Sequence, residues 1–256
     1  MSIEVVRNGA ILEVTINRPK ANAIDAPTSR EMSAIFDSFM NDTQMRVAIL
    51  TGAGGKFFSA GWDLSAASEG EAFESDYGIG GFGGICELKH RPKPVIVAVN
   101  GLAVGGGFEI ALAADLIVAA EHAEFFLPEA ALGLIADNAT IRLPRVVPPN
   151  IAREMLISGR RMSAAEAQSW GIVNQVTTSA DLMPDARRLA EKICLSAPLS
   201  VAAVLELMRE LETVPKDDAM QILRRNQTYR AAIDSQDAQE GALAYAEKRT
   251  PKWQGK

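Results

Sequence analysis

Residues that build metal centres, disulfide frameworks and cysteine nucleophiles are scarce in this sequence. Its 256 residues include only two cysteines and two histidines. Cys86 and Cys194 form no CxxC pair, and His90 and His122 lack the HExxH or HxH spacing that brings metal ligands together. No serine occupies a GxSxG elbow. We therefore expect no metal ion, no structural disulfide and no serine nucleophile.

Excess positive charge and long apolar runs are also lacking. Lysine and arginine total 26 against 32 acidic residues, which gives a net charge of −6. Basic residues cluster only in pairs, whereas phosphate binding needs a concentrated positive face. The most apolar stretch, 94–99, is far too short to span a bilayer, and the N-terminus shows no targeting pattern. The sequence thus predicts a cytoplasmic protein whose partners include neither nucleic acid nor membrane.

What the sequence does contain is an alternation of strand and helix patterns. Asn8-Gly9 separates two β-prone runs, 3–7 and 10–16, as in a hairpin, and an apolar stripe at helical spacing predicts a helix over 27–39. Further strands are predicted over 46–51, 94–99, 115–119, 124–127 and 172–176, with helices from the glycines at 105–107, from a capping box at Ser163 and from Pro184 onward. This alternation predicts an α/β core over residues 1–199 and a helical C-terminal region over 200–256.

One glycine-rich segment matches a nucleotide-binding motif by its letters alone. Residues 78–83, Gly-Ile-Gly-Gly-Phe-Gly, fit GxGxxG. The motif indicates dinucleotide binding only where it leaves a strand and opens a helix. Here it follows the acidic stretch 69–76, so a mobile loop is the better interpretation.

The most informative segment for chemistry is the run from Asn100 to Ala114. Its three glycines at 105–107 follow a strand, and a helix that begins there has N–H groups free to face an anion. Glu109 is the only ionisable residue in this apolar run and lies one helical turn after Gly106. A buried carboxylate has a raised pKa, which suits proton transfer near neutral pH. The alternative, an ion pair with Arg142 or Arg145, is equally compatible with the local pattern.

A second isolated carboxylate and a segment of small residues complete the pattern. Glu129 follows Pro128 among apolar neighbours, where an ordinary surface glutamate is the simpler interpretation if it is taken alone. Small residues at 59–61 permit close approach of backbone to a ligand, and Trp62 follows them, although a packed core tryptophan is the usual case. Two glutamates beside an oxyanion-type loop are what α-proton chemistry on a carbonyl compound requires.

In combination and order, several segments resemble the crotonase (enoyl-CoA hydratase/isomerase) superfamily, and this resemblance covers essentially the whole chain. The segments are Asn17-Arg18-Pro19-Lys20-Ala21-Asn22-Ala23, Phe58-Ser59-Ala60-Gly61-Trp62-Asp63-Leu64, Lys93-Pro94-Val95-Ile96, Val99-Asn100-Gly101, Gly105 to Glu109, Pro128-Glu129 and Ala246-Glu247-Lys248-Arg249.

The resemblance implies a fold and a set of site residues. The fold is a ClpP/crotonase-like spiral of β-β-α units with a helical C-terminal region that mediates trimer formation, with trimers often paired into hexamers. The backbone N–H groups of Trp62 and Gly106 form an oxyanion hole, and Glu109 and Glu129 are the catalytic acid and base. Coenzyme A arrives on the substrate, so no separate cofactor is expected. Its binding residues map to Ala21, Ala60, Gly61, Asp63, Leu64, Gly105 and Lys248.

The implied activity is that of an enoyl-CoA hydratase-type lyase, which adds or removes water across the 2,3 double bond of an acyl-CoA thioester. The resemblance also makes crotonobetainyl-CoA a candidate substrate. Its trimethylammonium group would favour aromatic or acidic walls, for which Asp76, Tyr77, Phe82 and Asp137 are candidates. One departure stands out. Residues 134–140 lack the proline and the two glycines common in family members with hydratase activity. A double-bond isomerase and a non-catalytic acyl-CoA-binding protein are therefore the alternatives.

Overall fold

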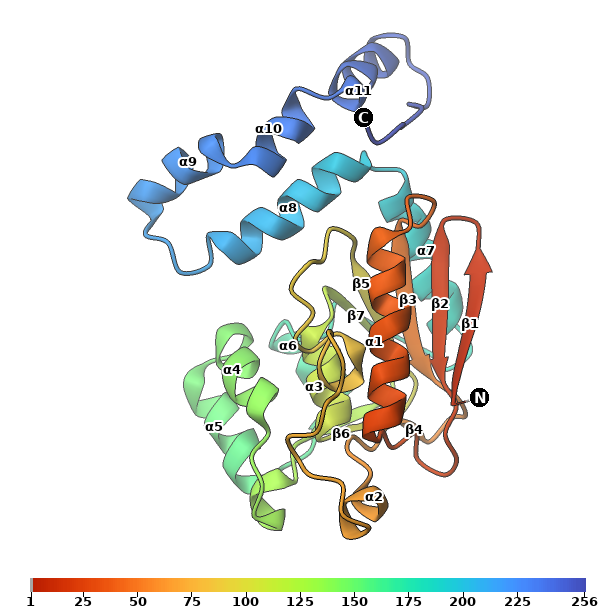
Figure 1. Cartoon of the computed structure of the whole chain (residues 1–256), viewed down its shortest axis with the longest axis vertical. Coiled ribbons are helices and arrows are strands. Elements are labelled where there is room, and N and C mark those ends of the chain that lie inside the picture. Colours follow the sequence, from red (N-terminus) through yellow and green to blue (C-terminus); the bar gives the residue numbers. More distant parts are fainter. Residues whose placement is uncertain (1) are drawn as a thin grey trace.

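A computed structural model describes residues 2–256 of the chain as strands and helices (Figure 1). The strands are β1 (Ile3–Asn8), β2 (Ile11–Ile16), β3 (Val47–Gly52), β4 (Phe57–Ser59), β5 (Val95–Val99), β6 (Leu102–Val104), β7 (Leu116–Ala120), β8 (Glu124–Phe126), β9 (Met162–Ser163) and β10 (Gln175–Thr177). The helices are α1 (Ala26–Asn41), α2 (Leu64–Ser68), α3 (Gly106–Ala113), α4 (Asp137–Val146), α5 (Pro149–Ser158), α6 (Ala164–Ser169), α7 (Leu182–Cys194), α8 (Pro198–Glu210), α9 (Lys216–Arg225), α10 (Gln227–Ile233) and α11 (Gln236–Ala246), with 3-10 turns η1 (Phe82–Gly84) and η2 (Glu129–Leu132).

Two sheets form the framework. The larger has the order β1-β2-β3-β5-β7-β10, in which β1 and β2 make an antiparallel hairpin and the other neighbours are parallel. The smaller has the order β4-β6-β8-β9. Along the chain the order β-β-α repeats, and after the first hairpin each unit gives one strand to each sheet. The spiral of β-β-α units predicted from the sequence is therefore confirmed.

The larger sheet is buried on both faces, because its strands alternate between two apolar clusters. In β3, Ala48 and Leu50 pack into the main cluster with α1 and α3, while Val47 and Ile49 point to the other face. There they meet α7, which lies behind the sheet in Figure 1. Because both faces of the sheet are buried, the sequences of its parallel strands are continuous apolar runs. The sheet fixes the strand ends from which the site residues project.

The C-terminal helices α8 to α11 extend away from the sheets at one end of the molecule (Figure 1). α8 and α10 pack together around a small apolar cluster that contains Ala203, Leu207 and Ala232. Pro198 and Pro215 lie where α8 and α9 begin, so they start helices rather than interrupt them. None of the helices described within residues 2–256 is both long and apolar enough to cross a bilayer. The division at residue 199 and the role of this region in trimer formation remain predictions.

The structure corrects several boundaries. The strand predicted over 172–176 is only Gln175–Thr177, because residues 171–174 form the connection after α6. The helical pattern ends at α11, and residues 249–256 carry no helix. The short strands β4, β6 and β9 and the helices α4 and α5 were not predicted. Ser163 caps α6 through its hydroxyl, as expected.

Candidate active site

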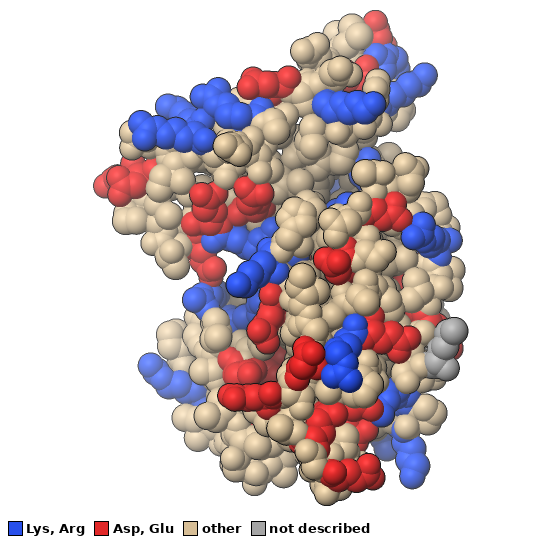
Figure 2. All heavy atoms as spheres, in the orientation of Figure 1, with Lys and Arg blue, Asp and Glu red and all other residues tan. Residues whose placement is uncertain are grey.

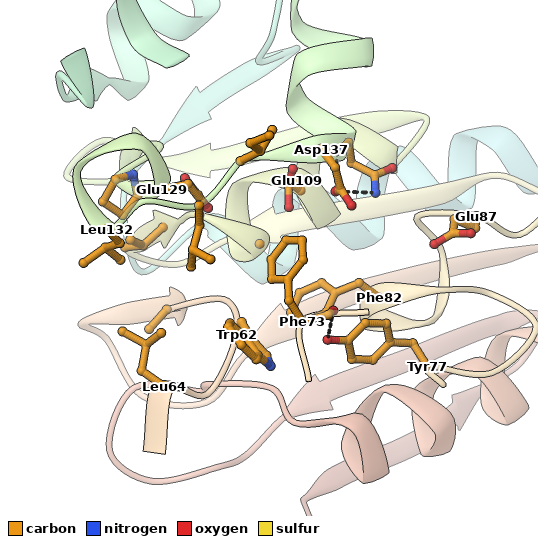
Figure 3. Close-up of a pocket in the computed structure, with 18 residues that line it drawn as sticks. Trp62, Leu64, Phe73, Tyr77, Phe82, Glu87, Glu109, Glu129, Leu132 and Asp137 are labelled. Carbon is orange, nitrogen blue, oxygen red and sulfur yellow. Dashed lines mark hydrogen bonds between the residues drawn. The ribbon is translucent and has the colours of Figure 1, made fainter. Parts of the chain in front are cut away.

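A cavity of about 170 Å³ lies between α3, η2, the start of α4 and the segment 60–82 (Figure 3). Its walls combine apolar and aromatic side chains with carboxylates, and no lysine, arginine or histidine lines it. The lining residues that carry the chemistry discussed below are Ala60, Trp62, Leu64, Phe73, Tyr77, Phe82, Glu87, Gly105, Gly106, Glu109, Glu129, Leu132 and Asp137.

Glu109 projects from the first turn of α3 into this cavity and is 7% exposed. Its Oε1 accepts a hydrogen bond of 2.9 Å from the backbone N–H of Ala139, near the start of α4. Burial raises the pKa of Glu109 from 4.5 to about 7, with smaller contributions in the same direction from the charges of Asp137 and Glu129. A carboxylate with this pKa is protonated about half the time at neutral pH and is able both to donate and to accept a proton.

The alternative that Glu109 pairs with a buried arginine is wrong. Arg142 donates to the carbonyl of Cys86 at 2.8 Å, and Arg145 forms an ion pair with Glu212 at the surface. Glu109 has no ion pair among residues 2–256. Its charge is therefore left free for a reaction.

Glu129, the first residue of η2, also turns into the cavity. Burial raises its pKa, and the charge of Asp137 adds to this effect. Its Oε2 is buried without a hydrogen-bond partner among the described residues. The surface-glutamate interpretation is thus wrong. Gly105, with a φ of 54°, makes room for this side chain, because a Cβ there would collide with the Glu129 carboxylate.

Two residues that line the cavity, Trp62 and Gly106, have backbone N–H groups without a partner among residues 2–256. In the segment 60–63, the amides of Ala60, Gly61 and Asp63 donate to Ala21 O, Ser59 Oγ and Ile24 O. The amide of Trp62 donates to no group among residues 2–256, and neither does that of Gly106 at the N-terminus of α3. The two segments touch, because a Cβ on Gly61 would lie 2.6 Å from the Gly106 nitrogen. This pair of unpartnered donors fits an anion such as an enolate oxygen.

The Trp62 side chain is a wall of the cavity rather than a core residue. Its Nε1 donates to Glu71 Oε1 at 2.8 Å, and its ring meets Phe73 edge-on at 5.4 Å. Sequence reasoning missed Glu71 and Phe73, which lie in a polar stretch without periodic pattern, and Glu87, which lies between Cys86 and Leu88. The one signal that could have found them was the cluster of glutamates and aromatics at 69–87.

Of the four residues proposed for a quaternary ammonium group, three line the cavity. Tyr77 and Phe82 meet edge-on at 5.4 Å, and Asp137 lies beyond Glu109 in the view of Figure 3. Burial raises the pKa of Tyr77 to about 12, so its hydroxyl, which donates to Phe73 O, remains neutral. Asp76 does not line the cavity; its carboxylate is exposed and accepts from Gly78 N.

The glycine-rich segment 78–83 does not leave a strand or open an α-helix, which excludes the dinucleotide interpretation. It packs on α1, where Ser33 Oγ accepts from Gly80 N and Ser29 Oγ accepts from Gly83 N. A Cβ on Gly84 would lie 2.6 Å from the Met32 carbonyl carbon. The glycines therefore permit the close packing on α1 that places Phe82 in the cavity. The mobility of this loop stays a prediction.

The residues expected to hold coenzyme A are only partly brought together. Ala60 N donates to Ala21 O, and Leu64 lies at the mouth of the cavity, so these segments adjoin. The Asp63 carboxylate caps α2 and pairs with Arg18, and its backbone, which is what was expected to contact coenzyme A, donates to Ile24 O. Lys248 follows α11, at the end of the molecule opposite α2 in Figure 1. Within one chain Lys248 does not reach the cavity. No group of three or more potential ligands in residues 2–256 is placed to hold a metal ion.

The raised pKa of Glu109 has a consequence for stability that is independent of catalysis. Between pH 4.5 and about 7 the folded protein holds a proton that the unfolded chain has released, so the free energy of unfolding falls as the pH rises through this window. We expect Glu109→Gln to stabilise the protein above pH 7, by up to about 3 kcal/mol, and to have no effect below pH 4.5. Thermal unfolding of both proteins at several pH values measures this, and a difference independent of pH would contradict the raised pKa.

Comparison with known proteins identifies the class. The enoyl-CoA hydratase/isomerase family model matches residues 6–256. The chain is 54% identical over 258 residues to carnitinyl-CoA dehydratases of Shigella flexneri and Escherichia coli (strain K12), covering 100% of this chain and 99% of each relative. The solved structure of an enoyl-CoA hydratase from Mycobacterium tuberculosis H37Rv superposes with a TM-score of 0.92 at 39% identity, covering 100% of this chain and 99% of that one. An enoyl-CoA hydratase from Bacillus anthracis gives 0.89 at 33% identity, with 100% of both chains covered.

The chain therefore belongs to the enoyl-CoA hydratase/isomerase family and has the crotonase fold. It is an enoyl-CoA hydratase-type lyase, as the sequence resemblance predicted.

Proposed function

We propose that this enzyme catalyses the reversible dehydration of carnitinyl-CoA to crotonobetainyl-CoA, with Glu109 and Glu129 as acid and base. The observation that carries this proposal is the convergence of the two carboxylates and the two unpartnered amides on one cavity. The 54% identity to carnitinyl-CoA dehydratases supports the choice of substrate.

The chemistry follows from the groups in the cavity. One glutamate, ionised, removes the proton from Cα, and the resulting enolate oxygen is stabilised by the N–H groups of Trp62 and Gly106. The other, protonated, gives its proton to the Cβ hydroxyl, which leaves as water while the double bond forms. The reverse sequence hydrates the double bond. The raised pKa of each glutamate allows one to be protonated while the other is ionised.

The charge of the cavity favours a cationic acyl group. Glu87, Glu109, Glu129 and Asp137 line it, without any basic side chain, and acidic side chains also gather on the lower half of the face shown in Figure 2. Tyr77 and Phe82 add aromatic surface to the same cavity. Aromatic and acidic walls are the usual means of holding a quaternary ammonium ion. The Cγ trimethylammonium group of carnitinyl-CoA matches this wall.

The test is an assay of carnitinyl-CoA, in which the conjugated thioester absorbance should appear and the product should differ from the substrate by one water. Turnover of neutral 3-hydroxyacyl-CoA alone would refute the substrate. Conversion of a 3-enoyl-CoA without any hydrated product would establish an isomerase, and tight CoA-ester binding without turnover would establish a non-catalytic protein.

Asp137 provides a sharper test of the acyl group. We expect Asp137→Asn to raise the KM for carnitinyl-CoA about 2- to 5-fold, because an exposed carboxylate attracts a cation only modestly. The KM for 3-hydroxybutyryl-CoA, which is uncharged at Cγ, should not change. Each variant is assayed at its own pH optimum, since Asp137 also raises the pKa of both glutamates. Asp76→Asn, outside the cavity, is the matched control. Equal effects on both substrates would contradict a role in cation binding.

Coenzyme A is proposed to lie along the backbone of Ala21, Ala60, Gly61 and Leu64. Lys248 of the partner subunit would then contact its phosphates in a homotrimer or hexamer. The exposed apolar side chains of the C-terminal helices support such assembly, since Met208 is 71% exposed and Tyr245 is 89% exposed in the single chain. Light scattering after size exclusion tests the assembly.

A further inference from the structure

Trp62 lacks the backbone hydrogen bonds that hold its neighbours in place. Asp63 N donates to Ile24 O at 3.0 Å, and Gly61 O accepts from Ile24 N at 2.8 Å. Within residues 2–256, neither the N–H nor the carbonyl of Trp62 bonds to any group. Each of the two peptide groups that flank Trp62 is thus held by a single hydrogen bond to Ile24, through Gly61 O or Asp63 N, while the Trp62 N–H stays free. The side chain provides a further restraint.

The indole ring adds this further restraint through Glu71. The Trp62 Nε1 donates to Glu71 Oε1 at 2.8 Å, and the other oxygen, Oε2, accepts at 3.0 Å from Ala26 N. Ala26 is the first residue of α1, a helix of 16 residues whose N-terminal amides have no intrahelical partner. The bond from Ala26 N satisfies one of these amides and ties Glu71 to the start of α1. Phe73 packs edge-on against the same indole.

We propose that Glu71 is a positioning residue, which holds the Trp62 peptide against α1 so that its N–H points at the thioester oxygen. This inference rests on the proposed oxyanion role of the Trp62 amide. Glu71 touches no reacting atom; it acts through the indole. A carboxylate suits this place because both neighbours are donors, whereas a glutamine has one acceptor oxygen and would turn an amide N–H towards the second donor.

The test is a double-mutant cycle in the full-length enzyme, with Glu71→Ala, Trp62→Phe and the double variant assayed on carnitinyl-CoA and on 3-hydroxybutyryl-CoA. We expect Glu71→Ala to lower kcat about 10- to 100-fold with KM changed less than about threefold, since misplacement of a donor affects the transition state most. Trp62→Phe keeps the amide but removes the indole N–H, so it should lower kcat similarly. In the Trp62→Phe background, Glu71→Ala should then cost less than in wild type.

Three further measurements separate positioning from a general loss of structure. Glu71→Gln should recover part of the lost kcat, because it retains one acceptor. Glu74→Ala, an exposed glutamate in the same segment, should match wild type. The melting temperatures of all variants should show that they remain folded at the assay temperature. The inference would be overturned if the kcat losses of Glu71→Ala and Trp62→Phe simply multiplied in the double variant, or if Glu71→Ala had the kcat of wild type. Turnover of carnitinyl-CoA by wild type would still support the proposed function in either case. Failure of wild type on carnitinyl-CoA alone, with the cycle preserved on 3-hydroxybutyryl-CoA, would refute only the substrate.

Discussion

Glu109→Gln and Glu129→Gln are each expected to lower kcat for carnitinyl-CoA dehydration by about 10²- to 10⁴-fold, the usual contribution of a positioned acid or base. Glutamine has nearly the same shape but neither accepts nor donates a proton at the required pKa. At position 109 it preserves the hydrogen bond, since an amide oxygen still accepts from Ala139 N. Folding is therefore retained while the proton transfer is lost.

The measurement is the initial rate of enoyl thioester formation, together with the Kd for a non-reactive CoA thioester. That Kd should change little, because both glutamates are proposed to act at the reacting carbons and not along coenzyme A. Glu121→Gln, an exposed glutamate between β7 and β8, controls for the loss of one negative charge. Wild-type rates in both glutamine variants would eliminate the proposed mechanism.

The second large effect is expected at Gly61, where the two proposed oxyanion donors meet. A Cβ at this position would lie 2.6 Å from Gly106 N and 2.7 Å from Val104 O, which no real side chain tolerates. Gly61→Ala must therefore push the Trp62 and Gly106 amides apart. Loss of one such donor typically costs about 2.7–4 kcal/mol in the transition state, and we expect kcat to fall by about 10²- to 10³-fold.

Backbone strain alone has to be separated from this displacement. Gly61 has a φ of 78°, which disfavours any other residue, but Gly54 has a φ of 80° and no atom within 4 Å of the place that a Cβ would take. Gly54→Ala thus carries the same strain without the collision. It should lower the melting temperature slightly and leave kcat unchanged. Equal kcat values for the two variants would show that the geometry at Gly61 does not set the oxyanion donors.

The fold was largely predictable because its strands are long apolar runs or clear alternations. β3, β5 and β7 are buried on both faces, so their composition alone distinguishes them. The short strands β4, β6 and β9 span two or three residues each, too few for any period to appear. α4 carries Pro144 in its interior, which sequence reasoning takes as a helix breaker. Its existence depends on packing against α3 and α5.

Site residues were predictable where a charge stands alone among apolar neighbours. Glu109 and Glu129 both satisfy this condition, and the structure brings them to one cavity. Glu71 lies among other polar residues, and its partner Ala26 is distant in the sequence, so no local pattern distinguishes it. Glu87 lies between the apolar Cys86 and Leu88, but in a segment without strand or helix period. Arg142 and Arg145 were plausible partners for Glu109 only because the sequence does not show which way α4 faces.

The departure at residues 134–140 also has a physical explanation. Family members with hydratase activity commonly carry glycines at this place. In this chain α4 begins here instead, at Asp137, and the Ala139 N–H donates to Glu109. Because this hydrogen bond comes from the backbone, Glu109 keeps a donor although the glycines are replaced by other residues.

If the cavity holds the acyl group as proposed, its acidic lining should also exclude some thioesters. Acyl chains that end in a carboxylate, such as those of dicarboxylic acids, would bring a further anion into a cavity whose described lining includes Glu87 and Asp137 but no basic side chain. Such compounds share the coenzyme A portion with the proposed substrate, so contacts to that portion provide no discrimination among them. Rejection therefore depends on like-charge repulsion at the far end of the acyl chain.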